Sequence, residues 1–514
     1  ACGSTLTDDS LDSSLSATGR LGTLLSVGES YASNAHLTWA VDPALLSEAE
    51  TMTSTYYTGG QANCLQTDQH PASSAAKQWL AKLTGGAASD PMFITPYANV
   101  DVSALSHAGL DSDLRTAYAL GNSVAGGILD GRTFDSIGWP ADGIADMSVL
   151  QSIAEYGHLS TVLLSSSQMA VTSGYDDAVA NVTTGVGDTL HVLLSNDTIT
   201  GILANASTRS AGESFNVEQD YLAQTAMIAD EAPALQRSIV VAPPSGWDPS
   251  STVASQLLID TVNAPWLESE SLSDMAAGGP AAGESHAQVS VREVPSNELS
   301  ADYLNRVKQA SASVDTFQSL LASPAPSYLQ RLEAVIAGTE SSAWRDDTSG
   351  GDNLLDGLTS YISDAENKIA LSEVKRATLA GKSGTLPVSV YNGMDQAIEV
   401  RVVASSVGGR VTIKGDIAPV TVQPRQVQTV HLSLNSLQIG TTQVKLQLVT
   451  KDNSPLPISA QSVSVVSTLY GRTVLVLIIV ALAIVVLTSA TRWLRQWLAN
   501  GPPASGDDTG MDED

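Results

Sequence analysis

An uncharged apolar run near the C-terminus, from Val474 to Thr491, constrains the architecture of this chain more than any other feature. At about 1.5 Å per helical residue, a helix over this run crosses most of a hydrocarbon core about 30 Å thick. Arg492 and Arg495 follow the run, whereas only Arg472 precedes it. Because positive charges collect on the cytoplasmic side of a span, we expect a single-pass membrane protein with a cytoplasmic C-terminus and a large extracytoplasmic N-terminal part.

The flanks of the run favour a membrane helix over the alternative, a buried core helix. Tyr470, Trp493 and Trp497 stand where aromatic side chains collect at a membrane–water interface. Only a short acidic tail follows, which offers a core helix no domain to pack against. The sequence therefore assigns 470–498 to the span with its flanks and 499–514 to a cytoplasmic tail. Residues 1–20 do not resemble a secretory signal, so we expect a mature form or a fragment.

Charge and cysteine content exclude several classes of protein. The chain carries 25 Lys and Arg against 54 Asp and Glu, a net charge of −29, which would repel the phosphates of a nucleic acid. Cys2 and Cys64 are the two cysteines and could form one bridge, but they do not form a disulfide scaffold or a zinc module. The seven histidines show no metal-binding spacing. The sequence predicts no metal and no cofactor.

Short apolar runs alternate with helical patterns over residues 36–298, after a lead-in over 1–35. The predicted strands are 37–41, 92–97, 161–165, 191–195 and 238–243, and the predicted helices include 75–83, 147–156 and 220–231. Alternation of this kind is typical of a parallel sheet, so we predict an α/β fold with a parallel (β/α) barrel-like domain. A stretch rich in Gly, Ala and Ser over 275–288 is predicted to be a loop or linker.

Two further segments follow this domain. Apolar residues recur at steps of three and four over 304–321, 328–336 and 355–369, which predicts a helical segment over 299–367 packed on the barrel. From residue 368 the period drops to two, as in Leu386, Val388 and Val390. This alternation predicts a membrane-proximal, immunoglobulin-like β-sandwich of about seven strands over 368–469.

Four acids stand where a predicted strand passes into a loop or helix: Asp42, Asp101, Asp142 and Asp197. If they converge at the carboxyl ends of parallel strands, they form a pocket with an acid and a base for glycosidic cleavage. The competing interpretation makes Asp42, Asp101 and Asp197 helix caps. Asp142 follows Trp139 in a tight turn, and this pairing of an acid with an aromatic plane suits a sugar site, although Asp-Gly also serves turns alone.

Several short motifs, taken in order, resemble an uncharacterised actinobacterial family of secreted, membrane-anchored proteins. These are Trp39–Leu46, Pro96-Tyr97 with Asp101, Trp139–Gly143, Ala264–Leu267, Ser342–Arg345, Gly384–Val388 with Tyr391-Asn392, and Ser467–Gly471. The resemblance covers most of the chain and implies a neighbourhood beside the gene for the lipid II flippase of peptidoglycan synthesis. It also implies that a signal peptide and an N-terminal β-domain precede this chain. It implies cell-wall context and brings no catalytic residues.

The sequence thus supports two functions. We favour an accessory envelope factor that binds wall glycan, a precursor, or a membrane protein such as the flippase. The alternative is a glycoside-hydrolase-like enzyme that uses the strand-end carboxylates. Aromatic residues make up only 5% of the chain and Trp493 and Trp497 belong to the membrane flank, which leaves few platforms for stacking a long sugar chain. The candidate pocket consists of Asp42, Asp101, Trp139, Asp142 and Asp197.

Overall fold

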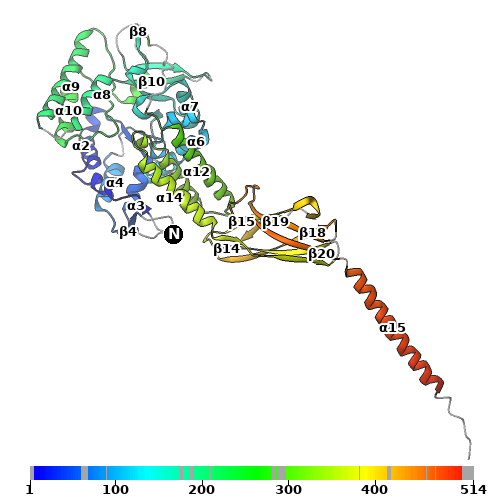
Figure 1. Cartoon of the computed structure of the whole chain (residues 1–514). Coiled ribbons are helices and arrows are strands. Elements are labelled where there is room, and N and C mark those ends of the chain that lie inside the picture. The colour runs from blue at the N-terminus through cyan, green and yellow to red at the C-terminus, as the bar shows by residue number, and fades with distance from the viewer. Residues whose placement is uncertain are drawn as a thin grey trace, which may run out of the picture. The chain divides into compact units, whose positions relative to one another are not determined.

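The protein divides into two compact units, Ala1–Gln318 with Pro324–Asp364, and Ser319–Ser323 with Ala365–Asp514 (Figure 1). The computed structural model describes residues 5–59, 67–87, 90–173, 177–185, 187, 189–207, 211–280, 285–286, 297–380, 383–413, 418–438, 440–458, 460–468 and 470–499. Cys2, Cys64 and the tail from residue 500 lie outside these residues, so the predictions for them stay predictions.

Short parallel strands form the centre of the first unit. β2 (Trp39–Val41) pairs with β5 (Met92–Ile94), while β6 (Ile137–Gly138) pairs with β7 (Thr161–Ser165), which pairs with β10 (Thr189–Ser195). β9 (Val179–Thr183) runs antiparallel beside β10. The sheets form half-barrels, and the described strands do not join into one continuous parallel barrel.

The other strands of this unit are peripheral. They are β1 (Thr5–Leu6), β3 (Tyr56–Gly59) and β4 (Thr67–His70) in one sheet, and β8 (Val171–Ser173) with β11 (Ser285–His286) in another. The strand predicted over 238–243 is wrong in extent, because only Val240 forms an isolated parallel bridge, to Ser195. Its neighbours Pro243 and Pro244 lack the N–H that a longer ladder needs.

Eleven described helices surround these sheets. They are α1 (Ser10–Leu15), α2 (Arg20–Ala35), α3 (Pro43–Met52), α4 (Ser74–Gly85), α5 (Val102–Ala108), α6 (Asp111–Ile128), α7 (Met147–Gly157), α8 (Asp197–Ala204), α9 (Ala211–Glu231), α10 (Ser251–Asn263) and α11 (Leu272–Gly278). The helices predicted from periodicity at 75–83, 147–156 and 220–231 lie within α4, α7 and α9 and are confirmed. Ser73 and Asp146 cap α4 and α7 by accepting a backbone N–H.

The loop predicted over 275–288 is wrong at its start, because α11 continues to Gly278. Ser271 accepts a hydrogen bond from the N–H of Asp274 at 3.1 Å and so starts this helix. Met275 and Ala276 are buried in a cluster with Phe93 and Leu163. Burial on the sheet therefore outweighs the low helical preference of the glycines that follow.

Three helices follow in sequence: α12 (Ala301–Leu320), α13 (Pro326–Thr339) and α14 (Ser349–Glu366). Each of the three predicted ranges overlaps one of these helices, but the helix predicted over 355–369 is wrong at its end, because Ile369 begins a strand, β12 (Ile369–Leu371). The rings of Phe317 and Tyr361 meet edge to face, and the Tyr361 hydroxyl lies 2.6 Å from that of Tyr328. The Tyr303 hydroxyl donates to the carbonyl of Thr339 at 2.6 Å, which ties α12 to the end of α13.

The second unit contains two facing sheets (Figure 1). One has the order β12 (Ile369–Leu371), β14 (Ser383–Asn392), β18 (Gln426–Ser436), β16 (Val411–Ile413). The other has the order β13 (Arg376–Ala380), β20 (Gln461–Thr468), β19 (Gly440–Thr450), β15 (Ile398–Ser406), β17 (Val420–Val422). Leu386, Val388 and Val390 are buried while their neighbours on β14 are more exposed, which follows from the two-residue period of a strand.

The final helix, α15 (Tyr470–Ala499), contains the apolar run. Its segment Val476–Gln496 is long and apolar enough to cross a membrane, and its side chains are exposed. This segment ends five residues beyond the predicted run at its C-terminal side, within the predicted flank that holds Trp493.

Candidate functional site

Two chain segments that follow parallel strands meet a third segment, distant in sequence, at the candidate site. After β5 the chain forms a short 3-10 turn, Tyr97–Asn99, and enters α5 at Asp101. After β6 it forms a second 3-10 turn, Ala141–Gly143. The third segment is the 3-10 turn Ser342–Trp344, which is followed by Arg345.

Asp101 is the buried centre of this arrangement, with no exposed side-chain surface. Its Oδ1 accepts from the Ala104 N–H at 3.1 Å and from Arg345 Nη2 at 2.7 Å. Its Oδ2 accepts from the Leu299 N–H at 3.2 Å and from Arg345 Nε at 2.8 Å. The carboxylate thus caps α5 and also receives a bidentate guanidinium, and every favourable acceptor position is filled. This geometry suits a structural anchor and leaves no lone pair free for proton transfer.

Asp142 lies on the open side of the same arginine. Arg345 Nη1 is 3.2 Å from Asp142 Oδ2, and Asn297 Nδ2 is 3.4 Å from the same oxygen. The Asp142 side chain is 60% exposed, whereas that of Arg345 is 6% exposed. Arg345 therefore joins two of the four predicted acids, one buried and one open to solvent.

The turn that carries Asp142 depends on backbone conformation. Asp142 has φ of 58° and Gly143 has φ of 66°, a left-handed region that aspartate tolerates and glycine favours. A Cβ on Gly143 would lie 2.6 Å from the backbone nitrogen of Ser165. Asp142 and Gly143 thus adopt the left-handed backbone that this turn needs. The missing side chain of Gly143 also lets the turn lie close against β7.

Trp139 is half-buried beside this turn. Its ring meets that of Phe93 edge to face, with centroids 6.3 Å apart and an interplanar angle of 67°. The side chain packs against the buried cluster of Phe93, Ile137 and Leu163. Part of the indole is therefore committed to the core, and only its remaining surface is open to a ligand.

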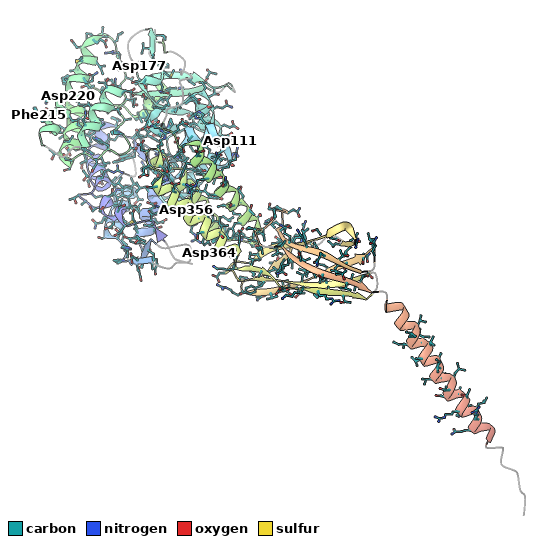
Figure 2. All side chains as sticks on the ribbon, viewed as in Figure 1. Asp111, Asp177, Phe215, Asp220, Asp356 and Asp364 are labelled. Carbon is teal, nitrogen blue, oxygen red and sulfur yellow. The ribbon has the colours of Figure 1, made fainter. Side chains whose placement is uncertain are left out.

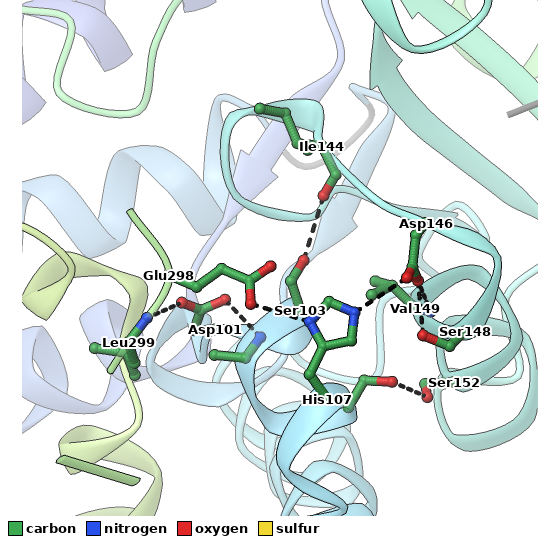
Figure 3. A network of polar contacts seen from close by, with 12 residues as sticks. Asp101, Ser103, His107, Ile144, Asp146, Ser148, Val149, Ser152, Glu298 and Leu299 are labelled. Carbon is green, nitrogen blue, oxygen red and sulfur yellow. Dashed lines mark hydrogen bonds and ion pairs between the residues drawn. The ribbon is translucent and has the colours of Figure 1, made fainter. Parts of the chain in front are cut away.

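A histidine network adjoins the Asp101 anchor, as Figure 3 shows. His107 Nδ1 lies 3.0 Å from Glu298 Oε2, and Nε2 lies 3.2 Å from Asp146 Oδ2. Burial alone would lower the pKa of His107, but the hydrogen bonds and charges of Glu298 and Asp146 outweigh it and raise that pKa. Burial raises the pKa of Glu298, against the influence of His107. An imidazolium here donates from both ring nitrogens and joins α5, α7 and the 298 segment.

Asp42 directly follows β2 and caps α3, and its Oδ1 accepts a hydrogen bond from the Ala44 N–H at 2.9 Å. Burial raises the pKa of this carboxyl to about 7, with the hydrogen bond from Ala44 acting against it and the charge of Glu48 adding to it. Burial thus brings the pKa of the Asp42 carboxyl close to neutral pH. No hydrogen bond or ion pair among the described residues joins it to Asp101 or Asp142.

Asp197 is exposed and stands apart from the arginine in its contacts. Its Oδ2 accepts from Ser165 Oγ at 2.7 Å and from the Ser167 N–H at 3.1 Å. The capping role expected of Asp197 belongs to its neighbour Asn196, whose Oδ1 accepts from the Ile199 N–H at 3.0 Å. Asp197 occupies the first turn of α8, where a negative charge is favourable.

Four residues of the network, Arg345, His107, Asp146 and Glu298, were missed by sequence reasoning. Arg345 lies in the Ser342–Arg345 motif, which carried a family resemblance but no chemical role. A buried aspartate needs a cation or several hydrogen-bond donors. This general rule was the one available indication that Asp101 has a partner such as Arg345. Nothing local in the sequence identified Arg345, which lies 244 positions from Asp101.

The Asp42 carboxyl should make stability depend on pH. Between about pH 4 and 7 the folded carboxyl keeps a proton that the unfolded one, with a pKa near 3.9, has lost, so stability should fall as pH rises. Asp42→Asn keeps the cap and does not titrate, so it should lose less stability than the wild type between pH 5 and pH 8 in urea unfolding. Asp42→Ala, which removes the cap and also does not titrate, should be about 1 kcal/mol less stable than Asp42→Asn at both pH values. The same pH response in wild type and Asp42→Asn would contradict this assignment.

Comparisons with known proteins define the family and leave its function open. A model described as "Family of unknown function (DUF6049)" matches residues 5–489, and the chain belongs to this family. No curated protein matches the sequence.

Among solved structures, the alpha-amylase AmyC from Thermotoga maritima is similar at 9% identity and a TM-score of 0.44, over 69% of this chain and 88% of that one. A FixG-related protein from Vibrio parahaemolyticus is similar at 19% identity and a TM-score of 0.17, over 20% of this chain and 98% of that one. At these TM-scores neither likeness defines the fold or the activity of this chain.

Proposed function

We propose that this member of the DUF6049 family is a membrane-anchored, extracytoplasmic cell-envelope protein of an actinobacterium that acts by binding rather than by catalysis. Its ligand is a wall glycan, a glycan precursor, or a membrane protein such as the lipid II flippase. The apolar segment Val476–Gln496 supports anchoring. The arginines after the apolar run favour a cytoplasmic C-terminus, with the preceding residues outside.

The pairing of Arg345 with both Asp101 and Asp142 carries the preference for binding. A glycosidase needs one carboxyl that gives a proton and a second that acts as base or nucleophile, on opposite sides of the scissile bond. Asp101 has its acceptor positions filled, and Asp142 Oδ2 is held by the Arg345 guanidinium at 3.2 Å. Neither is arranged to give up or take a proton during a reaction.

The exposed half of the site suits recognition of a polar ligand. Asp142 and Asn297 present a carboxylate and an amide to solvent at the ends of the parallel strands, beside the half-buried Trp139. Pockets in such sheets lie at this end, and sugars combine an apolar face with hydroxyls that carboxylates and amides bind. The arrangement supplies both in a small area, which fits a short glycan or precursor better than a long chain.

A hydrolase remains the second candidate because of one observation. The pKa of Asp42, raised to about 7 by burial, lies where a general acid works at neutral pH. In that function Asp42→Asn would abolish turnover and leave binding almost unchanged. If the protein only binds its ligand, Asp42→Asn should leave binding unchanged and there is no turnover to lose.

The binding function is tested with soluble, fluorescent peptidoglycan fragments and the full chain in detergent. Asp142→Asn should weaken binding about tenfold, since it removes charge-assisted hydrogen bonds of about 1.5 kcal/mol or more. Trp139→Phe should weaken it less. Asp197→Asn is the control and should be silent, because Ser165 and Ser167 donate the hydrogen bonds that its carboxylate accepts in the described part of the chain, and Arg345 is not among these donors. Unchanged binding in both site variants would refute the site, and release of reducing ends that Asp42→Asn abolishes would favour the hydrolase.

A further inference from the structure

A cavity of about 210 Å³ lies between α6, α12 and α13 in the first unit. Four acids line it: Asp113, Asp315, Glu333 and Glu340. Among the described residues, the lining includes no lysine or arginine. The described lining of this cavity is therefore acidic and lacks a basic side chain, unlike the site around Asp101 and Asp142, where Arg345 supplies a positive charge.

The floor of the cavity holds acceptors that lack donors. Glu340 has no exposed surface, and no N–H or hydroxyl of the described residues donates to its Oε1 or Oε2; its one side-chain hydrogen bond is with the carboxyl of Asp113, an acid like itself. Asp113 Oδ2 is also buried without such a donor, while its Oδ1 accepts from Ser311 Oγ at 3.2 Å. Buried acceptors in this state are costly, and a native structure normally provides them with donors.

The acids also disfavour one another's charge. Burial raises the pKa of Glu340 well above its usual range, and the nearby Asp113 raises it further. Burial raises the pKa of Asp315, to which Asp113 again adds. A cation among these groups would relieve the repulsion and permit both buried carboxyls to ionise.

We propose that this cavity binds a primary ammonium group, carried by a small free amine or by a lysine-like side chain. Such a group has three N–H donors for the buried oxygens of Glu340 and Asp113, and it would replace the hydrogen bond between these two carboxyls, which otherwise requires one of them to keep a proton. The lining residues Val314 and Ile336 are apolar and suit the alkyl stem behind the charge. The described residues do not include a cluster of acids, histidines or cysteines with metal-binding geometry, so a metal ion is not the ligand that this lining favours.

The experiment uses n-butylammonium and Nα-acetyl-lysine-N-methylamide as probes, titrated by calorimetry into the full chain in detergent at constant ionic strength. Tetramethylammonium is the matched control probe, since it has the same charge and no N–H donor. We expect butylammonium to bind about tenfold more tightly than tetramethylammonium. Binding of the lysine derivative as well would support a side-chain ligand, and binding of butylammonium alone would support a free amine.

Variants locate the binding. The double variant Asp315→Asn with Glu333→Gln should weaken butylammonium binding about fivefold or more. Glu340→Gln, which removes a buried carboxyl of the cavity, should weaken it to a similar extent. Asp364→Asn is the control, an exposed acid of α14 that does not line the cavity (Figure 2). A native circular dichroism spectrum checks that each variant is folded. Equal affinity for the two ammonium probes, or an equal loss in Asp364→Asn, would show general surface attraction and overturn the proposal.

Discussion

Arg345→Ala should lower the free energy of unfolding of the first unit by about 3–5 kcal/mol. The substitution leaves the Asp101 carboxylate buried without its cation, retaining only the N–H donors of Ala104 and Leu299. A buried charge that loses its partner keeps the full cost of leaving water. The measurement is the urea midpoint of the first unit, followed by tryptophan fluorescence, and a shift to much lower urea is expected.

Two further variants separate the buried contact from the exposed one. Asp142→Asn removes the contact on the solvent side and should cost less than about 1 kcal/mol, as exposed ion pairs do. Arg345→Lys keeps the charge but cannot bind Asp101 through two parallel N–H bonds, so its loss should be intermediate. A cost of Arg345→Ala no larger than that of Asp142→Asn would show that Asp101 does not depend on the arginine.

Removing residues 470–514 should transfer the protein from the membrane fraction to the soluble fraction. The segment Val476–Gln496 is the one described helix with the length and composition of a span, and its apolar side chains pack against nothing in the protein. Both units have cores of their own, with buried residues such as Leu163 in the first and Leu446 in the second. The truncated chain should therefore melt cooperatively, at the temperatures of the full chain in detergent.

Fractionation with carbonate extraction and calorimetry test this result together. Continued association of the truncated chain with membranes would contradict anchoring by α15, and aggregation without a cooperative transition would contradict independent folding. For orientation, Ser505→Cys in a background of Cys2→Ser and Cys64→Ser should resist an impermeant thiol reagent in intact cells. Ready labelling would place the C-terminus outside.

Local patterns were enough to predict much of the secondary structure. The uninterrupted apolar runs at 161–165 and 191–195 became β7 and most of β10, and the two-residue period at Leu386–Val390 became part of β14. The helical stretch predicted at 147–156 became α7, which begins directly after its aspartate cap, Asp146. Each of these signals lies within one element, because side-chain spacing follows directly from helix or strand geometry.

The candidate site depended on information that such patterns do not contain. Asp42, Asp101, Asp142 and Asp197 were found from the sequence because each follows an apolar run, yet identical patterns serve caps, turns and ion pairs. Sequence spacing did not show that Asp101 and Asp142 share one arginine, or that Asp42 and Asp197 have other partners.

The sequence by itself determined the alternation of strands and helices, the β-rich segment that follows, and the apolar C-terminal helix. Each of these follows from the local spacing of apolar residues and the length of the segment. Only the tertiary structure decided that the parallel strands form half-barrels, since strand pairing depends on contacts between distant segments. It also decided the burial of Asp101 and its pairing with Arg345, 244 residues away. Burial and charge pairing set the roles of these acids, and both arise only when the chain folds.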